Sequence, residues 1–182
     1  NILSPENKIQ KIKLFTARVK PTETDRTAHL RQDVYLRALQ AYIPQIEIIF
    51  GHFLEHAVSM PIAEPSGKVK ILNGKPQFVT VCKREEKGSD VNLAVHFLCD
   101  AMSNQYDCGV IISNDSDLAE PVRLVRMQKN KKIGIISPHP KVSKELSKHS
   151  HFQRTIRESV LRESQLPDMI PATNLKKPDS WM

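Results

Sequence analysis

Segments with the periodicity of a β-strand alternate along this chain with segments that have the periodicity of an α-helix. Strand patterns cover residues 11–19, 46–50, 78–82, 109–112 and 133–136, and helix patterns cover residues 27–42, 90–101, 118–129, 141–148 and 155–163. Strands that alternate with helices form βαβ units, in which parallel strands build the sheet and helices cover its faces. We therefore predict an α/β fold, a three-layer sandwich with a mainly parallel central sheet flanked by helices.

Residues 59–83 interrupt this alternation with short apolar runs that are punctuated by turn residues. The breaks fall at Pro61, Pro65, Gly67, Gly74 and Pro76. The pair Asn73-Gly74 is a strong hairpin turn. We predict a β-hairpin-rich insertion here, within a single domain over residues 1–163. Residues 164–182 are predicted to form an extended tail that packs on the domain or leaves it.

The composition favours a globular protein that binds a polyanion. Apolar residues make up 40% of the chain, and none of their runs reaches the roughly 18–20 residues that a membrane helix needs. The net charge of +7 favours a nucleic acid as partner and no membrane. Cys82, Cys99 and Cys108 lie in apolar runs without a C-x-x-C pair, so we expect buried free thiols and a cytoplasmic location. Assembly into a homodimer is compatible with the sequence.

Carboxylates follow the most apolar strand pattern in the chain. Gly109-Val110-Ile111-Ile112 has no alternation, as expected for a strand that is buried on both faces, and Ser113-Asn114-Asp115-Ser116-Asp117 follows directly. Ligands of open α/β sheets bind beyond the carboxyl ends of the strands. Asp90 stands at another helix start, after the strand pattern of residues 78–82. These aspartates are candidate ligands of a hard cation, although ordinary helix capping also explains aspartates at such positions.

Basic residues flank these acids. Lys83, Arg84 and Lys87 precede Asp90, and Arg18 and Lys20 leave the first strand pattern. Cations beside an acidic pocket attract the phosphates of RNA, but a solvated basic surface has the same appearance in a sequence.

The segments Lys87-Gly88-Ser89-Asp90-Val91-Asn92-Leu93-Ala94 and Gly109–Leu118 together resemble the NYN domains, a branch of the PIN-like nuclease superfamily. The similarity extends to residues 13–19, 133–136 and 164–168. The resemblance implies a PIN-like, Rossmann-like fold and a metal-dependent ribonuclease. It assigns Asp90, Asp115 and Asp117 to catalysis and to binding Mg²⁺ or Mn²⁺. We expect Ser113 to orient the metal shell and Asn114 to help bind RNA, together with Lys87, Arg18, Lys20, Lys83 and Arg84.

The chain departs from the family pattern at two positions. The family's first strand ends in a further aspartate, and we expect this strand to lie upstream of Asn1. Many relatives also have an acidic residue where His96 stands. A catalytically degenerate PIN-like module, which binds RNA or a protein partner, therefore remains as an alternative.

One further pattern matches a different class of enzyme. His52, Glu55 and His56 have the H-x-x-E-H spacing of inverted zinc peptidases, in which a helix presents both histidines to the metal. Here the pattern follows a strand and Gly51, so a continued strand or an edge loop is the simpler interpretation.

Overall fold

The structure, a computed structural model, describes residues 3–128 and 130–181 and has a mixed α/β fold. The strands are β1 (Ile12–Ala17), β2 (Ile46–Pro61), β3 (Ile71–Leu72), β4 (Lys75–Pro76), β5 (Phe78–Lys87), β6 (Cys108–Ile112), β7 (Lys132–Ser137) and β8 (Phe152–Thr155). The α-helices are α1 (Ala28–Tyr42), α2 (Ser89–Met102), α3 (Ala119–Arg126), α4 (Lys144–His149) and α5 (Glu158–Glu163). The 3₁₀ turns are η1 (Ser116–Leu118) and η2 (Asp179–Trp181).

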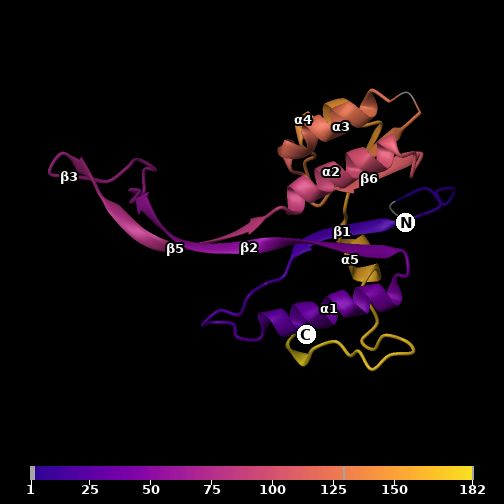
Figure 1. Cartoon of the computed structure of the whole chain (residues 1–182), viewed down its shortest axis with the longest axis horizontal. Coiled ribbons are helices and arrows are strands. Elements are labelled where there is room, and N and C mark those ends of the chain that lie inside the picture. The colour runs from indigo at the N-terminus through magenta and orange to yellow at the C-terminus, as the bar shows by residue number, and fades with distance from the viewer. Residues whose placement is uncertain (1–2, 129, 182) are drawn as a thin grey trace.

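The strands form two separate three-stranded sheets and a small two-stranded one. β1 pairs with β2 in parallel, whereas β6, β7 and β8 are parallel to one another in the second sheet. Figure 1 shows β1 and β2 between α1 on one side and α2 on the other. The mixed α/β class agrees with the sequence, but the predicted single central sheet is not confirmed, because β1 and β6 do not pair in the described chain.

The core lies where the second sheet is covered by α2, α3 and α4. Its buried side chains are Phe97, Ala101, Ile111, Leu118, Val122, Val125, Ile133, Ile135 and Leu146. From Ile133 to Ser137 every residue of β7 is buried, because β6 and β8 flank it. That position explains an apolar run without alternation.

A two-stranded arm leaves this body (Figure 1). Beyond Gly51, β2 pairs antiparallel with β5, in a ladder that runs from His52 opposite Lys87 to Pro61 opposite Phe78. The short strands β3 and β4 close its tip through Asn73 and Gly74, whose φ values of 50° and 74° suit the predicted hairpin turn. The hairpin begins before residue 59 and ends after residue 83, because both strands continue to the body.

Four local predictions need correction. The strand β6 is not buried on both faces: its burial alternates, and Ile112 is 63% exposed because it lies outside the core cluster that holds Ile111. Residues 152–155 form the strand β8, so the last predicted helix begins only at Glu158, as α5. Cys82 and Cys99 are exposed, not buried, because Cys82 lies on the arm and Cys99 on the outer side of α2; Cys108 is half-buried. The three thiols are free, as predicted.

The segment after residue 163 returns to the body. Ile170 is buried and Trp181 packs edge-on against Tyr35, with ring centroids 6.0 Å apart. No helix in the described ranges has the length and apolar character to cross a membrane.

Candidate functional site

Two loops of the body bring the predicted acids together. Gly88, with φ of 90°, turns the chain from the end of β5 into α2, so that Asp90 lies in the first turn of this helix. The second loop follows β6, where the Asp115 carboxylate accepts a hydrogen bond of 3.0 Å from the backbone N–H of Asp117. Asp115 therefore caps η1, as the capping interpretation predicts, whereas no side chain caps α2.

The electrostatics of Asp90 confirm that these acids are neighbours. The pKa of Asp90 is raised above its ordinary value, first by partial burial and then by the negative charges of Asp115, Glu86 and Asp117. Like charges disfavour ionisation when they are held close together. The two loops therefore form one cluster of carboxylates, which we call the acidic cluster: Asp90, Asp115, Asp117 and Glu86.

Glu86 is the member of the acidic cluster that the sequence analysis missed. It lies at the end of β5, and its carboxylate accepts a hydrogen bond from the Ser89 hydroxyl at the start of α2. The sequence held one indication of it, since Glu86 stands directly before the segment that resembles the NYN motif and four residues before Asp90.

The donor set of the acidic cluster suits a hard divalent cation. All its side chains offer carboxylate oxygens, the ligands that Mg²⁺ and Mn²⁺ prefer, and a cation would relieve the repulsion that, after partial burial, contributes to the raised pKa of Asp90. Within the described residues, no three His, Cys, Asp or Glu side chains converge as a ready metal cage. Mg²⁺ does not need such a cage, since it binds through one or two carboxylates and keeps several waters.

Ser113 and Asn114 hold the loop in place. The Ser113 hydroxyl accepts a hydrogen bond of 3.1 Å from the Asp115 backbone N–H. The Asn114 side-chain oxygen accepts one of 2.7 Å from the backbone N–H of Ser143, just before α4. The side-chain oxygen of Asn114 thus fixes the loop to the body. The side-chain N–H groups of Asn114 are the donors that could bind a ligand.

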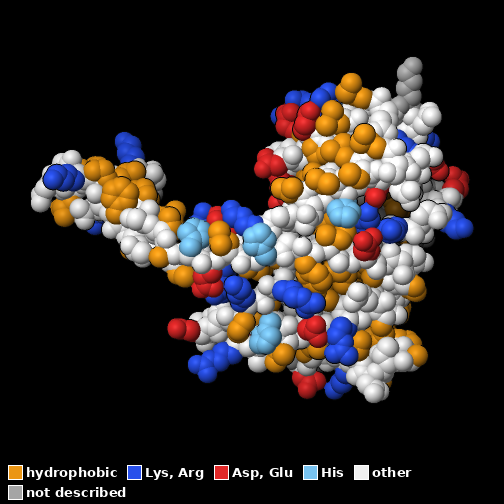
Figure 2. All heavy atoms as spheres, viewed as in Figure 1, with side chains coloured by type: hydrophobic (Ala, Val, Ile, Leu, Met, Phe, Trp, Pro, Cys, Tyr) orange, Lys and Arg blue, Asp and Glu red, His pale blue; other side chains and the backbone are white. Residues whose placement is uncertain are grey.

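The pairing of the arm separates the predicted basic residues. Directly opposite residues share one face of a two-stranded ribbon, so Lys83 and Lys87 lie on the face of His56 and His52. Arg84 lies on the other face and forms an ion pair of 3.1 Å with Glu55. Figure 2 shows histidine, lysine and arginine side chains along the near part of the arm.

Arg18 and Lys20 belong to a different part of the surface. The Arg18 guanidinium lies 4.4 Å from the centre of the Phe50 ring and pairs with Asp33 at 3.6 Å. Lys20 is close enough to Glu55 to help lower the pKa of that carboxyl, after the larger effects of Arg84 and Cys82. Lys20 therefore lies near Glu55 and its partner Arg84, whereas Arg18 lies over Phe50 beside Asp33.

The structure decides how the zinc-peptidase pattern of His52 and His56 and the position of His96 are to be interpreted. His52, Glu55 and His56 lie on the strand β2, where Glu55 faces away from the two histidines, so the helical zinc arrangement is absent. His96 lies beside Lys13, whose ammonium is 3.1 Å from His96 Nδ1 and donates to Asp100 at 2.6 Å. His96 is thus a hydrogen-bonded histidine between α2 and β1.

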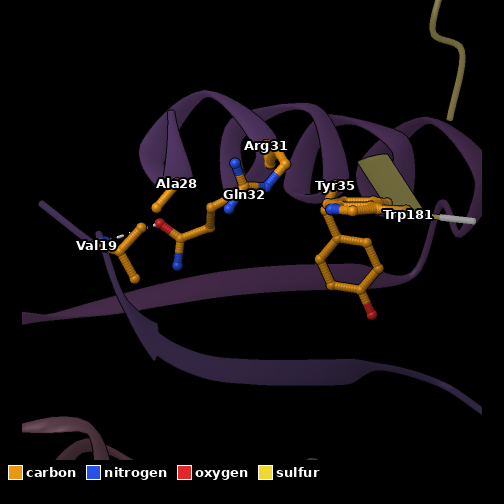
Figure 3. Close-up of a pocket in the computed structure, with 6 residues that line it drawn as sticks. All are labelled: Val19, Ala28, Arg31, Gln32, Tyr35 and Trp181. Atoms are coloured by element: carbon orange, nitrogen blue, oxygen red, sulfur yellow. Dashed lines mark hydrogen bonds between the residues drawn. The ribbon is translucent and has the colours of Figure 1, made fainter. Parts of the chain in front are cut away.

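An open cavity lies on the opposite side of the first sheet, along α1 (Figure 3). Its lining is Val19, Ala28, Arg31, Gln32, Tyr35 and Trp181. Gln32 closes one end, since its side chain accepts from the Val19 N–H at 2.9 Å and donates to the Ala17 carbonyl at 2.8 Å. Two aromatic rings and one guanidinium therefore face an open space that is separate from the acidic cluster.

Comparison with known proteins gives three results. The model of the NYN domain matches residues 57–156, more than half of the chain. The chain is also similar to 6-hydroxy-3-succinoylpyridine 3-monooxygenase HspA of Pseudomonas putida, at 30% identity over 93% of this chain and 57% of that protein. It thus spans little more than half of that relative's length. Its fold is similar to a protein of unknown function from Vibrio parahaemolyticus, with a TM-score of 0.49, 14% identity, and coverage of 81% of this chain and 69% of that one.

Proposed function

Because this chain belongs to the NYN domain family, whose fold is nuclease-like, we propose that it is a metal-dependent endoribonuclease. The observation that carries the proposal is the acidic cluster, in which partial burial and then the charges of Asp115, Glu86 and Asp117 raise the pKa of Asp90. A protein gains nothing in stability from crowding carboxylates, so such a cluster, with two of its members in the loop after β6, favours a cation-binding role.

Asp90, Asp115 and Asp117 would hold Mg²⁺ or Mn²⁺. A bound divalent cation supplies charge stabilisation to a phosphodiester and lowers the pKa of a water molecule. Asp115 is fixed by its bond to the Asp117 N–H, and Ser113 fixes the backbone of Asp115. These contacts keep one carboxylate oriented while the others adjust to a ligand.

The arm would bind the RNA backbone. Lys83 and Lys87 lie on one face, and both pair with Glu85, at 2.5 and 3.1 Å. One carboxylate against two ammonium groups leaves a positive balance next to Gly88 and Asp90. Phosphates of the RNA would also bind outside the face of Lys83 and Lys87, at Arg18, Lys20 and Arg84. The side-chain N–H groups of Asn114 would contact RNA at the loop after β6.

We also propose that the intact fold has a single central sheet. β1 and β6 each have one edge without a strand partner in the described chain. The strand that the family resemblance expects upstream of Asn1 would pair with both and unite the two sheets into a mainly parallel one. Its terminal aspartate would then join the acidic cluster.

Cleavage of labelled RNA tests the proposal. The full-length protein is incubated with single-stranded and structured RNA in Mg²⁺, Mn²⁺ or EDTA, beside Asp115→Asn and a control, Glu120→Gln. Glu120 is a nearby exposed acid that pairs with Arg123 and lies outside the acidic cluster. We expect metal-dependent cleavage that falls at least about 100-fold in Asp115→Asn and persists in Glu120→Gln. Binding of RNA without cleavage would instead favour the degenerate binding module.

A second candidate function follows from the relative of Pseudomonas putida, whose name describes a 3-monooxygenase of 6-hydroxy-3-succinoylpyridine. The cavity along α1 offers Tyr35 and Trp181 as aromatic faces that would suit an aromatic substrate, whereas the Arg31 guanidinium there is already paired with Asp25 at 2.5 Å. Loss of this hydroxypyridine in the presence of oxygen and a reduced nicotinamide, with no RNA cleavage, would favour this candidate.

A further inference from the structure

The arm ends in a tip that carries large apolar side chains into solvent. Met60, Val69, Ile71, Leu72, Phe78 and Val79 form this apolar tip, and each is between 42% and 59% exposed. A two-stranded ribbon that packs on nothing else is marginally stable in water. The apolar tip therefore needs a partner surface, because clusters of this kind mark sites of protein association.

The same chain has a second uncovered apolar surface, on α2. Val91, Val95, Cys99 and Met102 follow one another at helical spacing, so they share one side of the helix, which we call the α2 stripe. Val91, Val95 and Met102 are 65%, 50% and 75% exposed. Figure 2 shows hydrophobic side chains both at the end of the arm and over the α2 and α3 part of the body, with an open notch between them.

The charges around the two surfaces are complementary. The tip carries Lys68, Lys70 and Lys75 against one acid, Glu64. None of these lysines takes part in an ion pair of the described residues, and neither do Asp90, Asp115 and Asp117 at the start of the α2 stripe. The basic apolar tip of one copy can therefore contact the α2 stripe and its neighbouring acids on another copy with favourable electrostatics.

The tip is also too far from its own α2 stripe to cover it. The ladder from residue 52 to residue 61 extends the arm by roughly 30 Å, at about 3.3 Å per residue, away from the start of α2. That length is comparable to the diameter of a small domain, so the tip can reach across a neighbouring molecule.

We propose that the chain forms a two-fold dimer in which the arm of each copy seats its apolar tip on the α2 stripe of the other. Both uncovered surfaces are then buried twice in one closed assembly, as the symmetry of a reciprocal contact requires. The outer part of the arm from the pair Val58 and Val81 outward, residues 58–81, has 24 residues, a number within the range that one side of a standard interface uses. The contact brings tip lysines of one copy next to the acidic cluster of the other.

Light scattering after size-exclusion chromatography tests the dimer. We expect wild-type mass near twice the 20.7 kDa of one chain, and monomer mass for the tip variant Ile71→Asp/Leu72→Asp and for the stripe variant Val95→Asp. The control is Leu30→Asp on α1, where Leu30 is 56% exposed, as Leu72 is 53%. It should stay dimeric, and circular dichroism should show that all variants are folded.

Three outcomes would overturn the proposal. A monomeric wild type would mean that a different occupant covers both surfaces. A dimeric tip variant would exclude the arm from the interface. A monomeric tip variant beside a dimeric Val95→Asp would indicate pairing between arms instead of a seat on α2.

Discussion

Gly51 is the position where a single added methyl group should disturb both the fold and the acidic cluster. It lies where β2 leaves β1 and enters the arm. A Cβ at this position would lie 2.9 Å from the Ser89 hydroxyl oxygen and 3.1 Å from the Ser89 backbone nitrogen, and closer still to the carbonyl oxygen of Lys87. Real Cβ contacts under 3.0 Å essentially do not occur, and two of these three atoms belong to the backbone.

The Gly51→Ala variant therefore has to displace the segment that carries Asp90. Overpacking of this kind costs about 1–3 kcal/mol. In a chain of this size about 1 kcal/mol lowers Tm by roughly 2–4 °C, so we expect a decrease of roughly 2–12 °C by differential scanning calorimetry. We also expect RNA cleavage to fall, because Asp90 moves with Ser89.

Gly74→Ala serves as the matched control. Gly74 has φ of 74° and no atom within 4 Å of an added Cβ, so its substitution costs about 1–2 kcal/mol of backbone strain at the arm tip. Cleavage should be unaffected in this variant. If the Gly51→Ala variant has the same Tm and the same cleavage rate as the wild type, the close packing of Gly51 on the start of α2 is refuted.

Two further predictions concern charged groups. Replacing Lys13 in a Lys13→Met variant leaves the half-buried Asp100 without its 2.6 Å partner, so urea unfolding should show a loss of about 1–2 kcal/mol, and Asp100→Leu in the same chain should restore part of it. The raised pKa of Asp90 means that its charge opposes folding above that pKa, and that this opposition disappears as the pH falls below the ordinary value. Asp90→Asn should therefore stabilise the fold at pH 7 by at most about 0.5 kcal/mol, since Asp90 is largely exposed, and by nothing near about pH 3. A gain independent of pH would contradict the raised pKa of Asp90.

Local patterns identified the elements whose neighbours are near in sequence. The apolar run of β6 and the aspartates behind it, the Asn73-Gly74 turn and the helices α1 and α2 all follow from spacing and turn chemistry. The sequence placed Asp115 in the loop after β6. Its proximity to Asp90 was expected from the family resemblance and from the usual position of ligand sites at the carboxyl ends of parallel strands.

The missed features depend on partners that are distant in sequence. β8 is a short strand of mixed polarity, and it forms because the Phe152 ring fills the space beside Gly134 on β7. The division into two sheets depends on which strand edges meet, and no periodicity encodes that. Cys82 looked buried because its run is apolar, but a two-stranded arm has no second layer to cover it.

The proposed ribonuclease function is tested most directly by comparing two reactions of one protein preparation. The full-length wild type and its Asp115→Asn variant are each given labelled RNA with Mn²⁺, and separately 6-hydroxy-3-succinoylpyridine with oxygen and a reduced nicotinamide, the substrate named for the relative. We predict that the wild type cleaves RNA, that Asp115→Asn does not, and that neither consumes the pyridine. Consumption of the pyridine without RNA cleavage would contradict the proposed ribonuclease function.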